Sequence, residues 1–81
     1  MPNGEIDENN LFVRMHNAGL VRENKAKSVE ELAEFLALNK DSIVPLIELG
    51  RRHGYLEAIE DGRLKYFLSK KGIMFVSSLF T

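Results

Sequence analysis

The sequence predicts one small α+β domain that consists of three helices, a β-hairpin and a C-terminal helix. Its 81 residues give room for a single hydrophobic core. Ser28 and Glu31 have the spacing of a helix-capping pair and stand at the start of a run with helical periodicity. Asp61-Gly62, a common hairpin turn, separates two short runs that are rich in aromatic and aliphatic residues.

The composition is that of an ordinary globular protein. Hydrophobic residues make up 44% and charged residues 28%, and 11 basic against 12 acidic side chains leave a net charge of −1. This balance excludes a polybasic protein that holds nucleic acid by bulk charge alone. The absence of cysteine excludes a disulfide framework, a thiolate nucleophile and cysteine-ligated zinc. The apolar runs are too short to span a bilayer and no signal-peptide pattern opens the chain, so we expect a cytoplasmic protein without a membrane partner.

Acidic and basic residues are unevenly distributed along the chain. Residues 1–8 include three acids and no base, whereas the segment after residue 62 includes four bases and no acid. A Pro-Asn-Gly run near the start is a poor beginning for any regular element. We therefore expect a flexible N-terminal tail over residues 1–7 and the folded domain over residues 8–81.

A first helix is predicted over residues 8–18. Leu11, Met15 and Ala18 fall on one helical face, and a glycine follows. Residues 20–27 lack this periodicity and are predicted to form a loop.

A second helix is predicted to begin after Ser28. In a capping box, the Ser28 hydroxyl accepts a hydrogen bond from the Glu31 N–H, and the Glu31 carboxylate accepts one from the Ser28 N–H. The apolar stripe behind this box consists of Val29, Leu32, Ala33 and Leu36.

A third helix is predicted over about residues 41–53. Its N-cap is Asp41 or Ser42, which places Pro45 in the first turn, where no backbone N–H is needed. Gly54 then ends the helix. Its expected buried face consists of Ile43, Leu46, Ile47 and Gly50. The basic residues of its last turn, which complement the helix dipole, are Arg51, Arg52 and His53.

The hairpin is predicted from strands over residues 55–59 and 64–68. A two-residue turn at Asp61-Gly62 would join them, because both positions of that turn favour residues that tolerate a positive φ. The cross-strand pairs that follow are Glu60 with Arg63, Ala58 with Lys65 and Leu56 with Phe67.

A fourth helix is predicted from residue 70 to about residue 80, with Ser69 as its N-cap. Lys70 and Lys71 lie in its first turn, where the helix dipole disfavours cations, so their position favours a role such as phosphate contact. The helix is apolar nearly all round, and exposed apolar patches normally mark association sites, so we expect a homodimer. The residues expected at its interface are Met74, Phe75, Leu79 and Phe80.

Three segments resemble parts of winged helix-turn-helix proteins. Residues 28–43 are similar to a capped helix that leads through a turn into a recognition helix. Residues 54–56, Gly-Tyr-Leu, resemble the step that starts the wing. Residues 66–72, Tyr-Phe-Leu-Ser-Lys-Lys-Gly, are similar to the return strand and helix start of MarR-like regulators and small archaeal winged-helix proteins. The resemblance covers residues 11–80 and implies a three-helix core, a β-hairpin wing and a C-terminal helix.

The resemblance also implies a protein that binds double-stranded DNA, usually as a dimer, and regulates transcription. The third helix would meet the major groove, and the wing over residues 55–68 would contact the neighbouring backbone. Val44 and Pro45 cannot donate hydrogen bonds and Glu48 repels phosphate, so we expect most of the affinity to come from phosphate contacts. The residues expected to contact DNA are Lys40, Ser42, Arg51, Arg52, Arg63 and Lys65, with Lys25 and Lys27 as further candidates.

The alternative interpretation is a protein–protein interaction module that does not read DNA. In that case the apolar side chains of Val44, Pro45 and Leu49, or the fourth helix, would dock a partner. Catalysis is not expected, because the chain shows no Gly-rich phosphate loop and no recognisable nucleophile–base set. His16 and His53 fall in separate predicted elements, so we expect no metal site. We also expect no cofactor and no small-molecule substrate.

Overall fold

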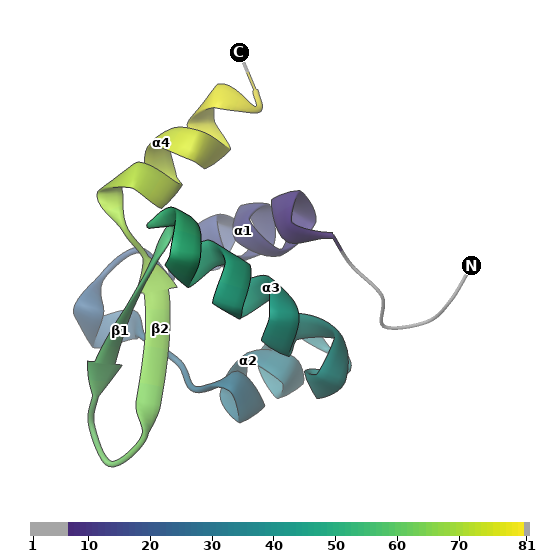
Figure 1. Ribbon diagram of the computed structural model, residues 1–81, viewed down its shortest axis with the longest axis vertical. Helices are drawn as coiled ribbons and strands as arrows, with labels where there is room; N and C mark the ends of the chain where they lie inside the picture. Colours follow the sequence, from purple (N-terminus) through teal and green to yellow (C-terminus); the bar gives the residue numbers. More distant parts are fainter. Residues whose placement is uncertain (1–6, 81) are drawn as a thin grey trace.

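The computed structural model describes residues 7–80 (Figure 1). These residues form four α-helices, one 3-10 turn and a two-stranded antiparallel sheet, so the predicted α+β class is confirmed. In chain order the elements are α1 (Glu8–Asn17), η1 (Glu23–Lys25), α2 (Val29–Leu36), α3 (Lys40–His53), β1 (Leu56–Glu60), β2 (Leu64–Leu68) and α4 (Lys70–Ser78). The predicted tail falls outside the described residues except for Asp7, which caps α1 by accepting a hydrogen bond from the Asn10 N–H at 2.8 Å.

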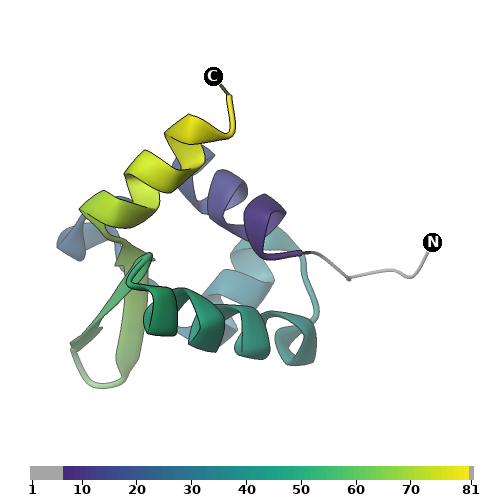
Figure 2. The same cartoon turned by 45° about the horizontal axis from the view of Figure 1, so that its top comes forward.

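One hydrophobic core lies where the four helices meet the end of the hairpin that carries Leu56 and Leu68. Figure 2 shows α1, α3 and α4 around this centre, with α2 behind α3. Apolar positions spaced three and four residues apart supply the helical part of the core, as the periodicity predicts. The buried side chains are Leu11, Phe12, Met15, Leu20, Leu32, Leu36, Ile43, Ile47, Leu56, Leu68 and Val76.

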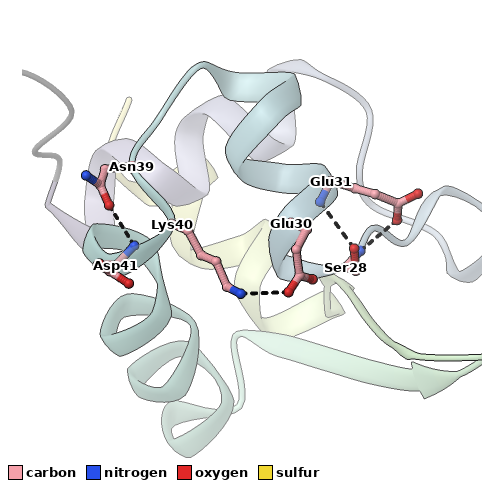
Figure 3. A network of polar contacts seen from close by, with 6 residues as sticks. All are labelled: Ser28, Glu30, Glu31, Asn39, Lys40 and Asp41. Atoms are coloured by element: carbon pink, nitrogen blue, oxygen red, sulfur yellow. Dashed lines mark hydrogen bonds and ion pairs between the residues drawn. The ribbon is translucent and has the colours of Figure 1, made fainter.

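The start of α3 differs from the prediction. Its N-cap is Asn39, whose side-chain oxygen accepts a hydrogen bond from the Asp41 N–H at 2.8 Å (Figure 3). The helix therefore begins at Lys40, ahead of the predicted caps. Pro45 consequently lies in the second turn and has no N–H to donate to the Asp41 carbonyl. Several neighbouring residues can all cap a helix, and the tertiary position of the turn selects among them.

The hairpin register also differs from the prediction, by one residue. Leu56 lies opposite Leu68 and Glu60 opposite Leu64, so the loop contains three residues instead of two. Only Gly62 in that loop has a positive φ, whereas the predicted turn needs one at both central positions. The observed register places both buried leucines, Leu56 and Leu68, on the face that meets the core.

The strand β1 begins at Leu56 because Tyr55 completes the end of α3. The Tyr55 N–H donates to the Gly50 carbonyl at 2.8 Å, and Gly54 adopts the left-handed conformation with a φ of 81°. The predicted loop before α2 also contributes an extended residue. Lys27 pairs with Tyr66 on the outer edge of β2 through two backbone hydrogen bonds of 2.8 and 3.0 Å.

The two outer helices end earlier than predicted, while their predicted starts are confirmed. α1 ends at Asn17 instead of Ala18, and α4 ends at Ser78 instead of residue 80. Ser69 caps α4 as predicted: its hydroxyl oxygen accepts a hydrogen bond from the Gly72 N–H at 3.0 Å. None of the helices within residues 7–80 combines the length and apolarity required to cross a bilayer.

The C-cap of α2 carries backbone strain. Ala37 has φ 56° and ψ 47°, a left-handed conformation that costs an L-residue roughly 1–2 kcal/mol. The turn is held nevertheless, because the Arg14 guanidinium of α1 donates a hydrogen bond to the Leu36 carbonyl at 2.7 Å. This contact joins the ends of two helices that are 22 positions apart in the sequence.

Replacing Ala37 by glycine is expected to raise the free energy of unfolding by about 0.5–1 kcal/mol. Glycine adopts the left-handed conformation without the Cβ penalty, although part of the gain is lost to its unfolded-state entropy. Urea denaturation of the two proteins checks this. Ala33→Gly in the interior of α2 is the control, and it should be less stable than the wild type by about 1 kcal/mol. Destabilisation by both glycines would contradict the strain at Ala37.

Candidate nucleic-acid interface

The outward face of α3 changes character along the helix. Its exposed residues at helical spacing are Asp41, Pro45, Glu48 and Arg52, so acids lie in the first part and bases at the end. Of the other predicted groove-facing residues, Ser42 and Val44 are half-buried. The N-terminal part of α3 therefore offers little positive charge to a phosphate backbone.

Lys40, a predicted DNA contact, is held by an acid of α2. Its ammonium Nζ lies 2.8 Å from a carboxylate oxygen of Glu30 (Figure 3). This hydrogen bond is the main reason why the pKa of Glu30 lies below its ordinary value and that of Lys40 above it. The Arg63 guanidinium makes a smaller contribution to the lowered pKa of Glu30. Because Lys40 already has a partner, an anion would have to compete with Glu30 for it.

Lys65 on the hairpin is also paired. Its ammonium lies 3.5 Å from an Asp61 carboxylate oxygen, and only 24% of its side chain is exposed. Lys40 and Lys65, two of the predicted DNA-contacting cations, therefore have carboxylate partners. The sequence positions alone do not predict these ion pairs.

The predicted arginines lie on the exposed surface. Arg51 and Arg52 lie in the last turn of α3, and Arg63 lies at the tip of the hairpin. The Arg51 guanidinium is 5.9 Å from the ring centroid of Tyr66 on β2, so it bridges α3 and the sheet. Within residues 7–80 none of these three arginines forms an ion pair.

The predicted further candidates Lys25 and Lys27 lie outside α3 and the hairpin, at the end of η1 and just after it. Lys27 pairs with Tyr66 on β2, the residue whose ring the Arg51 guanidinium also approaches. The Lys27 ammonium is 4.9 Å from the ring centroid of Phe35 on α2. The ammonium of Lys27 is therefore already in contact with an aromatic ring of α2.

A shallow hollow between η1 and the hairpin tip has a mixed lining. It contains three acidic and two basic side chains, so it offers no net attraction to a polyanion. Its lining residues are Arg22, Glu23, Asn24, Ala26, Ile59, Glu60, Asp61 and Lys65. In the described part of the chain, no three histidine, aspartate or glutamate side chains gather closely enough to hold a metal ion.

The residues predicted at a dimer interface fall into two groups. Met74, Leu79 and Phe80 are exposed, with 71% of Met74 and 70% of Phe80 open to solvent. Phe75 is half-buried, and its ring stacks on Tyr55 with a centroid distance of 4.5 Å. The Phe75 ring thus packs inside the domain, where it helps to fix α4 against the end of α3.

No protein-family model matches this chain, and no curated protein sequence matches it closely enough to indicate a relative.

Proposed function

We propose that this chain is a winged helix-turn-helix protein that binds double-stranded DNA. In this proposal α2 and α3 form the helix-turn-helix, and the hairpin forms the wing. The observation that carries it is the set of exposed arginines at the end of α3 and the tip of the hairpin, Arg51, Arg52 and Arg63, which form no ion pair within residues 7–80. The order of the helices and the antiparallel hairpin is compatible with the layout of that family.

The chemistry of this surface favours phosphate over base edges. An arginine guanidinium carries several donors in a planar fork and stays charged at all relevant pH values, so it suits phosphate oxygens. The exposed part of α3 that would face the bases carries Asp41, Pro45 and Glu48, none of which donates a side-chain hydrogen bond when the acids are ionised. We therefore propose that most of the affinity is electrostatic and that sequence discrimination is weak.

The proposal predicts a salt-dependent affinity for duplex DNA. Each neutralised phosphate releases counterions, so the logarithm of the binding constant should fall against the logarithm of salt concentration with a slope of about −0.9 per contact. Contact by the three arginines alone gives a slope near −3 on this basis. Anisotropy titrations of a labelled duplex at several salt concentrations measure it. Absence of binding at low salt, or a binding constant indifferent to salt, would contradict the proposal.

We further propose that the protein acts as a homodimer in transcriptional control. Met74 on α4 and Leu79 and Phe80 just after it are exposed apolar side chains, and the same segment of a second copy is the partner that we expect to cover them. Light scattering should then give a mass of about twice the 9.2 kDa of the chain. Met74→Glu with Phe80→Glu should give a folded monomer by circular dichroism and light scattering. A wild-type monomer at micromolar concentration would contradict the dimer.

A further inference from the structure

The first turn of α4 is attached directly to the end of α3. The Ser69 hydroxyl donates a hydrogen bond to the Gly54 carbonyl at 2.5 Å, and the Ser69 N–H donates to the Tyr55 carbonyl at 3.0 Å. The two helices therefore place their ends side by side, as both cartoon views show (Figures 1 and 2). We call the basic residues that meet here the α3–α4 corner: Arg51, Arg52, His53, Lys70 and Lys71.

Aromatic contacts position two of the corner residues. The Lys71 ammonium lies 5.5 Å from the ring centroid of Tyr55, and the imidazole of His53 stacks on the same ring at 5.7 Å. Phe75 stacks on Tyr55 at 4.5 Å and connects it to the core. Lys71 is thus positioned next to the basic end of α3, while both lysines remain exposed.

Helix electrostatics explains only part of this corner. Arg51, Arg52 and His53 lie at the C-terminal end of α3, where the helix dipole favours cations. Lys70 and Lys71 lie at the N-terminal end of α4, where the dipole disfavours them, and the first turn of α4 contains no acid to offset their charge. Among the ion pairs of residues 7–80, none includes either lysine. Lys71 gains a cation–π contact with Tyr55, but no contact within residues 7–80 offsets the unfavourable position of Lys70.

We propose that Lys70 and Lys71 contact the phosphate backbone of bound DNA and extend the interface from α3 onto α4. The inference rests on the proposed DNA binding. The corner is exposed and spread over the ends of two helices, which suits a continuous polyanion better than a small enclosed anion. It also adds positive charge next to Arg51 and Arg52, at the end of α3 that is free of acids.

Neutralising both lysines tests the inference. Lys70→Gln with Lys71→Gln should reduce the magnitude of the salt slope by about 2, or about 1 per phosphate contact. The control is Arg22→Gln with Lys25→Gln, which removes the same charge beyond the hairpin and should leave the slope unchanged. Thermal unfolding should show that the lysine variant remains folded with a stability close to that of the wild type, because the loss of two charges that oppose the helix dipole offsets the loss of the Lys71–Tyr55 contact.

The outcomes separate the inference from the proposed function. If the wild type binds duplex and the lysine variant has the same salt slope, the proposed contact by α4 is wrong. The proposed contacts by the arginines would then still stand. Equal reductions in both variants would also overturn it, since they would indicate a response to net charge. Failure of the wild type to bind duplex at low salt would overturn the proposed function itself.

Discussion

Replacing Gly72 by alanine is expected to lower the free energy of unfolding by about 3 kcal/mol or more. A Cβ at this position would overlap the carbonyl oxygen of Tyr55 and would lie 3.0 Å from a Leu68 methyl group. The carbonyl belongs to backbone that is fixed by the Ser69 hydrogen bond, so it cannot move away without disturbing the junction of α3 and α4. Urea denaturation, with the slope m as a check on two-state behaviour, measures the change.

Whether Gly72→Ala lowers or raises the stability distinguishes the effect of packing from the effect of helix propensity. Alanine is intrinsically better than glycine inside a helix by about 1 kcal/mol, so propensity alone predicts stabilisation. Gly62→Ala is the control: its φ of 78° disfavours alanine, but nothing lies within 4 Å of the added methyl, so its cost should be only about 1–2 kcal/mol. A Gly72→Ala protein as stable as the wild type would contradict the close approach of α4 to Tyr55.

Neutralising the three exposed arginines is expected to have the largest effect on DNA binding. The variant combines Arg51→Gln, Arg52→Gln and Arg63→Gln. At low salt its affinity for duplex should fall about 100-fold, on the estimate that each charged contact contributes about 1 kcal/mol. Arg51 also packs over Tyr66, so thermal unfolding must show that the variant remains folded before the binding constants are compared.

A variant with the same loss of charge separates the effect of where the charges lie from the effect of the net charge. Arg22→Gln, Lys25→Gln and Lys27→Gln change the charge of the chain by the same amount, at residues that lie outside α3 and the hairpin. Because long-range attraction is screened beyond about 10 Å at 0.1 M salt, this variant should bind nearly as well as the wild type. A loss as large as that of the arginine variant would indicate an interface elsewhere on the molecule.

Features that depend on neighbouring residues could be predicted from the sequence. The capping box at Ser28, the cap at Ser69 and the glycine end of α3 at Gly54 are local, and the structure confirms each of them. The hairpin register could not be fixed in the same way. Asp61-Gly62 suits a two-residue turn, but the requirement to bury Leu56 and Leu68 on one face favours a three-residue loop.

The candidate site shows the same division between local and tertiary information. The sequence locates the cations but not their partners: Glu30, which pairs with Lys40, is ten positions away on another helix. Apolarity predicts that α4 is a surface for association, but the stacking of Phe75 on Tyr55 depends on where the end of α3 lies. Such pairings require the tertiary arrangement, because residues remote in the chain can satisfy a charge or cover a ring.

The central proposal is that the end of α3, the hairpin tip and the start of α4 all contact DNA. Amide chemical shifts of the labelled protein, recorded while a short duplex is added, test it most directly. The account predicts that the shift changes gather at residues 50–55, 62–64 and 70–72, and that residues 22–27 stay nearly unchanged. Changes centred on residues 22–27, or an unaltered spectrum at saturating duplex and low salt, would contradict it.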